Sequence, residues 1–536
     1  EGDVEVSEGI DYARFYTTTM KKFAALHDVD ITSKGTILVI SPWNFPCAIP
    51  IGGIVAGLAG GNTVILKPAT VAAPVAWLFA KAFWDAGVPK EALQVIITDR
   101  EALKELTTAP AIKHIILTGG TDTAQSIARI NPSTPLSAET GGKNAIILTA
   151  SGDRDHAIMN IVTSAFGNAG QKCSACSLLL VERSVYEDKN FQDKLKDAAT
   201  SIKVGSVWEA GNVVGPMITN RNDKLLQALT LEPGESWLVP PKFIDEKQYI
   251  LAPTVKWGVK PGSYSFRTEL FGPMLSVACI DNLQQGIELV NSLDYGLTSG
   301  LQSLDENEQK LWKDSILAGN LYINRGITGA IVNRQPFGGM KLSAFGGGVK
   351  AGGPNYCACL VKITDKPESN TDYKQSYPHA YEEEFAHARD INKLYGEQNA
   401  FRYLPLKNMV LRLFPGDSNE EAEMIALATK LCHTPLTISF DPNDDRTTAL
   451  SSTGCTLKKE TLDEFLKTMR SYERIRTCGA DIPMEMYEEA ARRNKYIATA
   501  KPVKNGRVEL IHYIKEQSIS FEFHRYGSIL DVPPVE

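Results

Sequence analysis

The sequence predicts an α/β protein whose strands form parallel, doubly wound sheets. Apolar, strand-like segments alternate with helix-like segments over the first 138 residues, the alternation continues to about Leu321, and it resumes near residue 409. Alternating strands and helices are typical of parallel sheets covered by helices on both faces. Such sheets bind ligands at the carboxyl ends of their strands, so the loops that follow the strands are the first candidates for a site.

Composition excludes several classes of protein. The 536 residues include 56 Lys and Arg and 63 Asp and Glu, a net charge of −7 that argues against a broad basic surface for nucleic acid. The sequence contains no run of about 18–20 apolar residues, the length that spans a membrane. The segment Glu1–Ile10 lacks the apolar core of a secretory signal. Nine cysteines without a framework spacing indicate free thiols in a reducing compartment. We therefore expect a cytoplasmic enzyme.

The first α/β unit covers 1–138 and opens with an amphipathic helix, Gly2–Met20. Four apolar segments are predicted strands, and each is followed by a helix-like segment. The strands are Thr36–Ile40, Thr63–Leu66, Leu93–Ile97 and His114–Leu117. The helices are Ile51–Ala59, Pro74–Ala86, Glu101–Leu106 and Thr123–Ile130.

The second unit covers 139–345. It contains a strand at Asn144–Leu148, a helix at Asp155–Phe166 and a strand at Leu178–Val181, and from Asn320 onward it is rich in Gly and loop-like. A short return segment over 346–366 follows, and the polar, acidic composition of 367–402 predicts a linker.

A third α/β unit with a tail covers 403–536. Its predicted strands are Met409–Phe414, Leu436–Phe440, Arg474–Arg476 and Tyr496–Thr499, and its helices are Asn419–Leu431, Leu462–Met469 and Pro483–Arg493. None of these strands ends in a Gly-rich phosphate loop, so we interpret this unit as structural.

The segment around Cys173 supports several interpretations. Cys173 and Cys176 have the spacing of a redox pair or of half a zinc site, although no second Cys-X-X-Cys or His pair at zinc spacing is present. Two small buried thiols would also explain them. The remaining interpretation is a single nucleophilic cysteine.

Two upstream motifs favour the nucleophile. Glu139 lies 34 residues before Cys173 at the edge of a Gly turn, where a carboxylate suits a general base. Asn44, in Ser41–Pro46, directly follows a predicted strand, where its amide can donate to a developing oxyanion. Each motif alone is weak, but their order and spacing together are specific.

In this order the motifs resemble the aldehyde dehydrogenase superfamily, over about Val4–Leu360. The resemblance implies that Cys173 is the nucleophile, Glu139 the general base and Asn44 the oxyanion donor. It implies a Rossmann-like NAD-binding domain over 1–138, with an incomplete N-terminal part, and a catalytic domain over 139–345. The return segment would serve oligomerisation. No metal is implied.

The same resemblance implies how NAD is bound. Lys67 would contact the adenosine ribose, the segment Thr118–Ala124 would lie under the pyrophosphate, and Glu269 would bind the nicotinamide ribose beside Phe271. The implied cofactor-binding residues are Lys67, Thr118, Gly119, Gly120, Gly141, Glu269 and Phe271. Thr70 stands where many relatives have an acidic residue that repels a 2′-phosphate, which weakens the preference for NAD over NADP.

The segment Arg325–Gly339 is similar to the aldehyde-anchor loop of L-glutamate γ-semialdehyde dehydrogenases, also called pyrroline-5-carboxylate dehydrogenases. The resemblance implies that backbone N–H groups at Gly329 and Ala330 hold the α-carboxylate, since Gly allows close approach of a ligand. By the same resemblance, Ser174 would donate a further hydrogen bond to the substrate, and Glu8 would lie near its amine. Phe45 and Phe337 would enclose the methylenes of the substrate. The implied substrate-binding residues are Ser174, Gly329, Ala330, Phe45, Phe337 and Glu8.

The C-terminal segments Asn399–Pro405, Tyr513–Ser520 and His524–Gly527 resemble the tail of proline utilization A, which joins an FAD-dependent proline dehydrogenase to this dehydrogenase. The resemblance implies that such a flavoenzyme module is linked to the chain or associated with it, preceding residue 1. It also implies a homo-oligomer, although His27–Lys34 is shorter than the oligomerisation hairpin of the relatives.

The resulting hypothesis is NAD-dependent oxidation of L-glutamate γ-semialdehyde to L-glutamate, the second step of proline catabolism, through a cysteine thioester. Three alternatives stay open. In the first, the substrate would be another short semialdehyde. In the second, the chain would be an inactive structural module of a larger proline-catabolic enzyme. In the third, Cys173 and Cys176 would form a thiol–disulfide switch.

Overall fold

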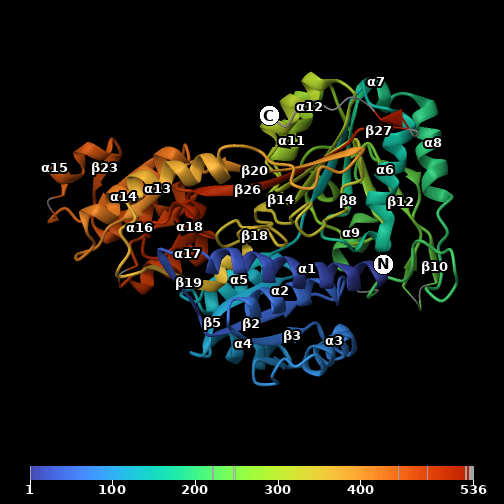
Figure 1. The fold of residues 1–536 in the computed structure, drawn as a ribbon. Coiled ribbons are helices and arrows are strands. Elements are labelled where there is room, and N and C mark those ends of the chain that lie inside the picture. The colour runs from blue at the N-terminus through green and yellow to red at the C-terminus, as the bar shows by residue number, and fades with distance from the viewer. Residues whose placement is uncertain are drawn as a thin grey trace.

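The computed structural model describes residues 2–219, 222–245, 247, 249–444, 446–479, 481–525 and 528–529. Within these residues the strands form three large sheets of six, nine and five strands, together with several two-stranded pairs. Figure 1 shows the N-terminal part in blue, the middle of the chain in green and the C-terminal unit in orange, with two long strands running from the orange unit into the green part.

The six-stranded sheet has the order β18-β6-β5-β2-β3-β4. Its strands are β2 (Thr36–Ser41), β3 (Thr63–Pro68), β4 (Leu93–Val95), β5 (Ile112–Thr118), β6 (Leu136–Glu139) and β18 (Ala344–Phe345). All neighbours are parallel except β18, which is antiparallel to β6. This confirms the predicted strands, with β4 two residues shorter.

Helices cover this sheet. They are α1 (Gly2–Ala24), α2 (Ala48–Ala59), α3 (Ala73–Asp85), α4 (Arg100–Thr108) and α5 (Thr121–Ile130). Helix α1 packs along α2 (Figure 1), with Tyr12, Tyr16 and Phe23 buried against the sheet's core. Strand β1 (Val29–Ser33) pairs antiparallel with β19 (Val361–Asp365), which brings the return segment back to the first domain.

The nine-stranded sheet has the order β20-β26-β16-β15-β7-β8-β13-β12-β9. Its strands are β7 (Asn144–Leu148), β8 (Cys176–Glu182), β9 (Ser236–Val239), β12 (Thr254–Trp257), β13 (Met274–Ile280), β15 (Thr298–Gln302), β16 (Asn320–Ile323), β20 (Glu397–Pro405) and β26 (Ile514–Glu522). Its helices are α6 (Arg154–Phe166), α7 (Arg183–Tyr186), α8 (Lys189–Thr200), α9 (Asp223–Ala228), α10 (Tyr264–Arg267), α11 (Leu283–Asn291) and α12 (Glu306–Ser315).

Two parts of this sheet differ from the sequence expectation. The segment from Asn320 was expected to be a loop, but its first residues form the buried strand β16. The expected linker 367–402 contains α13 (Tyr373–Ala380), a π-helical turn at Tyr381–Phe385 and the start of β20, so the expected boundary at 403 falls inside a strand. The polar start of β20 hid this strand, because Asn399 is buried through a hydrogen bond that Ser520 Oγ donates to its Oδ1, and not by hydrophobicity.

The five-stranded sheet is parallel, in the order β23-β22-β21-β24-β25. Its strands are β21 (Met409–Arg412), β22 (Leu436–Phe440), β23 (Thr456–Lys459), β24 (Arg474–Arg476) and β25 (Tyr496–Ala498). Its helices are α14 (Asn419–Leu431), α15 (Thr447–Leu450), α16 (Leu462–Thr468), α17 (Met484–Arg493) and α18 (Gly506–Glu509). The fully buried ion pair between Arg476 and Glu509 lies beside this sheet.

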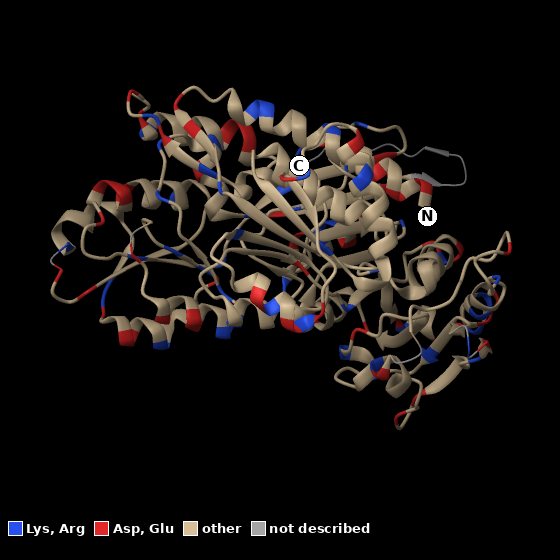
Figure 2. Cartoon of the chain, turned by 90° about the horizontal axis from the view of Figure 1, so that it is seen from below, with Lys and Arg blue, Asp and Glu red and all other residues tan. Residues whose placement is uncertain are grey.

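Figure 2 shows acidic and basic residues intermingled over the face in view. Within the described part of the chain, no helix is both long enough and apolar enough to cross a bilayer. Tyr526 and Gly527, the last residues of the C-terminal motif, lie outside the described residues.

Candidate active site

The carboxyl ends of four parallel strands meet at one edge of the six-stranded sheet. Ser41 of β2 is level with Pro68 of β3, and Thr118 of β5 is level with Glu139 of β6. Strand β2 lies between β3 and β5, so the chain changes direction across the sheet at this point. Such a switch point opens a crevice for ligands. The predicted Asn44 loop follows β2 at this crevice.

Cys173 is presented by a tight turn between α6 and β8. The turn contains Asn168 and Ala169, both with φ of 53°, and Gly170 with φ of 68°. A β-carbon at Gly170 would lie 2.2 Å from the carbonyl oxygen of Gly272, so only glycine fits there. Left-handed backbone at non-glycine residues is uncommon and clusters at functional sites.

Two asparagines hold the chain around Cys173. Asn44 donates from Nδ2 to the carbonyl of Gln171 at 3.0 Å, and Asn144 donates to the carbonyl of Cys173 at 2.7 Å. The predicted oxyanion donor therefore touches the segment that carries the predicted nucleophile. Asn144, which the sequence analysis missed, had no signal beyond its place at the start of a strand.

A cavity of about 450 Å³ unites most of the predicted catalytic and substrate-binding residues. Its walls come from α1, from the carboxyl edge of the six-stranded sheet, from the Cys173 turn and from the predicted anchor loop. The predicted residues that line it are Glu8, Phe45, Thr118, Glu139, Cys173, Ser174, Gly329, Ala330 and Phe337.

Burial controls the charges in this cavity. It raises the pKa of Glu139 to about 8, against the lowering effects of Lys350 and of a hydrogen bond from the Gly339 N–H at 3.0 Å. Burial, with Glu269 and Glu139, raises the pKa of the Cys173 thiol to about 12. Both groups are therefore mainly protonated at neutral pH in this state, and the thiol must lose its proton before it can attack.

Lys350 is the buried cation of this region. Its ammonium donates to Asn320 Oδ1 at 2.9 Å and to the carbonyl of Gly338, and its own backbone N–H donates to Glu516. A β-carbon at Gly338 would lie 2.9 Å from Glu139 Oε1 and 3.2 Å from Lys350 Cγ, so both side chains flank this glycine. The sequence analysis missed Lys350, because a lysine in a Gly-rich segment predicts an exposed loop residue.

The predicted cofactor residues Gly141 and Glu269 form a tight contact. The Gly142 N–H donates to Glu269 Oε1 at 2.8 Å, and a β-carbon at Gly141 would lie 2.2 Å from Glu269 Oε2. Phe271, two residues on, adopts φ of 51° and meets Trp43 edge to face at 5.7 Å between ring centroids.

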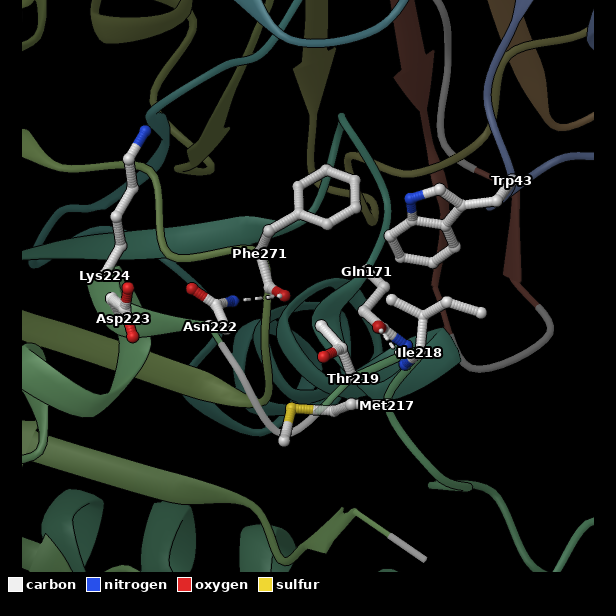
Figure 3. Close-up of a pocket in the computed structure, with 9 residues that line it drawn as sticks. All are labelled: Trp43, Gln171, Met217, Ile218, Thr219, Asn222, Asp223, Lys224 and Phe271. Atoms are coloured by element: carbon white, nitrogen blue, oxygen red, sulfur yellow. Dashed lines mark hydrogen bonds between the residues drawn. The ribbon is translucent and has the colours of Figure 1, made fainter. Parts of the chain in front are cut away.

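Trp43 and Phe271 also line a second cavity, of about 370 Å³, shown in Figure 3. Asn222 donates to the carbonyl of Phe271 at 3.4 Å, and Gln171 accepts from the Ile218 N–H at 2.9 Å. Gln171 thus belongs to this cavity while its carbonyl binds Asn44, so the two cavities share the Cys173 turn.

Lys67, Gly119 and Gly120 do not line either cavity, although they lie near the ends of β3 and β5. Gly119 and Gly120 precede α5, and a β-carbon on either would meet no atom closer than 3.5 Å. The approach to this helix N-terminus is therefore open, as a phosphate group requires. The pKa of Lys67 is lowered by partial burial.

The anchor loop does not use a left-handed glycine. Gly329 has no positive φ, and a β-carbon there would meet only Arg325 at 3.7 Å and Gln335 at 3.8 Å. The absence of a side chain, rather than unusual backbone, keeps this part of the loop accessible.

Cys176 lies inside the protein. It is the first residue of β8, is 1% exposed in the core, donates to the carbonyl of Leu178 and is a free thiol, as are the other eight cysteines. Glu8 lines the cavity, and burial, with Glu5 and Asp11, raises its pKa to about 7.

Known proteins share this architecture. Residues 1–364 match the aldehyde dehydrogenase family. A 1-pyrroline-5-carboxylate dehydrogenase of Geobacillus sp. (strain WCH70) is 34% identical over 379 residues, covering 66% of this chain and 72% of the relative. The Bacillus subtilis protein of the same name is 32% identical over 377 residues, covering 66% and 72%.

Two solved structures extend the comparison. Proline utilization A from Corynebacterium freiburgense has a TM-score of 0.86 and 37% identity, covering 98% of this chain. This chain spans 54% of the length of that protein. The 1-pyrroline-5-carboxylate dehydrogenase from Thermus, solved with bound NAD, has a TM-score of 0.63 and 31% identity, covering 68% of this chain and 73% of the Thermus chain.

Proposed function

Because this chain belongs to the aldehyde dehydrogenase family, we propose that it oxidises L-glutamate γ-semialdehyde, the open form of 1-pyrroline-5-carboxylate, to L-glutamate with NAD. One observation carries the choice of substrate. The cavity that holds Cys173 and Glu139 is also lined by Gly329, Ala330 and Glu8. Backbone N–H groups suit an α-carboxylate and Glu8 suits an α-amine. The names of the relatives from Geobacillus and Bacillus agree with this substrate.

Residues of this chain fit a dinucleotide. Gly119 and Gly120 leave the N-terminus of α5 open, and the Gly142 N–H fixes the carboxylate of Glu269, which can accept hydrogen bonds from ribose hydroxyls. In this proposal Lys67, Thr118, Gly119, Gly120, Gly141, Glu269 and Phe271 form the cofactor site. NAD, when bound, accepts the hydride that leaves the substrate carbon.

The first half of the proposed reaction belongs to Cys173. Its thiolate adds to the aldehyde carbon, and the carbonyl oxygen becomes an oxyanion that Asn44 Nδ2 and the Cys173 N–H stabilise. One such donor is worth about 2.7–4 kcal/mol. Collapse of this adduct expels hydride and leaves a thioester on Cys173. Phe45 and Phe337, which line the same cavity, enclose the methylenes of the chain.

The second half belongs to Glu139. Its carboxylate removes a proton from a water molecule, which adds to the thioester carbon, and the C–S bond breaks to release L-glutamate and the Cys173 thiolate. Burial of Glu139 suits this role, because a pKa of about 8 makes its carboxylate a stronger base than an exposed one.

The test is an assay of NADH formation with 1-pyrroline-5-carboxylate, repeated with NADP and with succinic semialdehyde. We expect the highest kcat/KM with the first substrate and NAD. Comparable kcat/KM for succinic semialdehyde, which lacks the α-amino acid group, would contradict the assigned substrate.

We also propose that the chain acts in the cytoplasm as a homo-oligomer, linked to or associated with an FAD-dependent proline dehydrogenase module. The likeness to proline utilization A over 98% of the chain supports the association, and nine free thiols support a reducing compartment. Conversion of proline to glutamate by the native protein purified from its source tests the association. Sedimentation tests the oligomer.

A further inference from the structure

In the anchor loop, Arg325–Gly339, two arginines contact the same carboxylate of β20. Glu397 Oε2 lies 3.0 Å from Arg325 NH1, and Glu397 Oε1 lies 3.2 Å from Arg334 NH1. The two arginines lie near opposite ends of the loop, so Glu397 ties both ends to one point. All three side chains are 16–28% exposed, which places these pairs in partly desolvated surroundings.

A second set of contacts lies beside this one. Gln335 is buried between the loop and the paired strands β20 and β26, where Asn399 and Ser520 face each other in register. Turned so that its amide nitrogen faces the loop, Gln335 donates to the carbonyl of Gly329 and accepts from Arg325 NH1 at 3.0 Å and from Ser520 Oγ at 2.9 Å. Asn399 Oδ1 lies 2.8 Å from the same Gln335 atom and 2.8 Å from Ser520 Oγ, so Asn399 packs against both side chains.

These contacts reach Gly329 directly. Gln335 binds its carbonyl, and Arg325 NH2 lies 3.7 Å from the position of a β-carbon on Gly329. Thr328, Gly329, Ala330 and Ile331 all line the substrate cavity. The backbone that faces the ligand is therefore supported from behind by residues of β20 and β26, far away in sequence.

We propose that Glu397, together with Asn399 and Ser520, is a specificity-determining support that fixes the Gly329–Ala330 backbone for the α-carboxylate of the aldehyde. This proposal rests on the proposed function. Its physical basis is preorganisation: N–H donors bind an anion well only when their positions are set before the ligand arrives. The loop's own backbone hydrogen bonds order Ile331–Gln335 and Phe337, but none of them is made by Gly329 or Ala330.

The proposal assigns a task to the C-terminal part of the chain. Strands β20 and β26 join the nine-stranded sheet next to β16, the strand that leads into the anchor loop. The loop thus leaves one strand of the sheet and is held by the next two. None of these supporting residues lines the cavity, so they are positioning residues and not catalytic ones.

The experiment compares two aldehydes in Glu397→Gln and Ser520→Ala. With L-glutamate γ-semialdehyde we expect KM to rise about tenfold, the equivalent of one lost charged hydrogen bond, while kcat is retained. With propanal, which has no α-carboxylate, we expect both constants to be unchanged. Arg334→Gln removes one ion pair from the loop side and should give the same pattern.

The matched control is Glu522→Gln. Glu522 pairs in register with Glu397 on the neighbouring strand. The substitution therefore removes a charge of the same sign at the same position along the two paired strands. We expect wild-type constants for both aldehydes. Melting temperatures of all variants identify any that fail to fold.

Three results would overturn the proposal. Equal changes of KM with both aldehydes would mean that these residues have a general structural role. Unchanged constants with both aldehydes would mean that the contacts do not affect substrate binding. A Glu522→Gln control that behaves like Glu397→Gln would mean a nonspecific charge effect. The wild-type enzyme tests the proposed function independently of the variants. If its kcat/KM shows no preference for L-glutamate γ-semialdehyde over propanal, the proposed function is wrong, and the support role that rests on it is wrong as well.

Discussion

The carboxylate of Glu269 occupies the space above Gly141 that a β-carbon would need. A β-carbon built on Gly141 lies 2.2 Å from Glu269 Oε2 and 2.5 Å from Glu269 Oε1. The neighbouring Gly142 N–H donates to the same carboxylate. The two glycines therefore set the position of a side chain that lies 127–128 residues further along the chain.

Gly141→Ala should impair cofactor binding by displacing Glu269. The methyl group must displace the Glu269 carboxylate, so we expect KM for NAD to rise about tenfold or more while the protein stays folded. Steady-state kinetics at saturating aldehyde measure this change.

A double-mutant cycle with Glu269→Gln identifies the cause. If Gly141→Ala acts by moving Glu269, the two losses share one origin and will not add in the double variant. Additive losses would show that the alanine acts elsewhere.

The two cysteines of the Gly170–Cys176 segment should behave oppositely. Cys173→Ala removes the proposed nucleophile, and we expect NADH formation to fall by more than about three orders of magnitude. Cys176→Ser should keep most activity, because Cys176 is buried in the core away from the cavity, and should cost about 1 kcal/mol of stability. A loss of activity in both variants would favour the redox pair that the sequence alone allowed.

Sequence patterns located the strands whose side chains are apolar on both faces. Strands β2 and β7 are nearly continuous buried runs in parallel sheets, and β3 and β5 each contain a three-residue apolar run, so local composition carries the prediction. The sequence analysis expected ligand-binding loops at the carboxyl ends of these strands, and the ends of β2 and β5 do lie at the edge that faces the cavity. The grouping of Glu139, Cys173 and the anchor loop in one cavity was implied only by the family resemblance, because these residues follow elements of different sheets.

Strands β20 and β26 show what local patterns miss. Gln517, Ser518 and Ser520 of β26 are buried, and each is satisfied by a partner distant in sequence, such as the Ala318 carbonyl for Gln517 and the Pro336 carbonyl for Ser518. Polar residues of this kind predict a loop or a surface, because their burial is stabilised only by contacts that form in the folded chain. Lys350 escaped notice for the same reason.

The pH dependence of acyl-enzyme hydrolysis should report the ionisation of Glu139. Its carboxylate is the active base, and its pKa of about 8 predicts that the hydrolysis rate rises with pH and reaches half its maximum near pH 8. Tyr12, Tyr356 and Cys173 also face Glu139 but carry no positive charge, so Lys350 is the cation that favours the ionised form, beside the hydrogen bond from the Gly339 N–H.

Lys350→Met should therefore move this midpoint to higher pH, by about one unit or more, whereas Lys350→Arg should keep it near the wild-type value. The NADH burst followed by the steady state, measured from pH 6 to 10, separates acylation from hydrolysis. A uniform fall in rate at every pH would assign Lys350 a purely structural role.

Glu8 should weaken the fold at alkaline pH while it serves the substrate. Its pKa is raised from 4.5 to about 7 by burial and by Glu5 and Asp11, so the folded protein holds this proton more tightly than the unfolded chain does. The cost of ionising Glu8 is absent below pH 4.5, grows between pH 4.5 and 7, and is complete above pH 7, where it amounts to about 3 kcal/mol.

Glu8→Gln removes this cost, so its melting temperature should exceed that of the wild type at pH 8 and match it near pH 4.5. The same variant should raise KM for L-glutamate γ-semialdehyde, because the α-amine loses its carboxylate, and should leave KM for propanal unchanged. Asp11→Asn, one turn along α1 and exposed, is the charge control and should leave both KM values unchanged. A gain in stability that does not depend on pH would mean that Glu8 is not the group that titrates, and an unchanged KM for the semialdehyde would remove Glu8 from the amine site. Stability gained at the expense of substrate binding is the pattern expected of a residue kept for function.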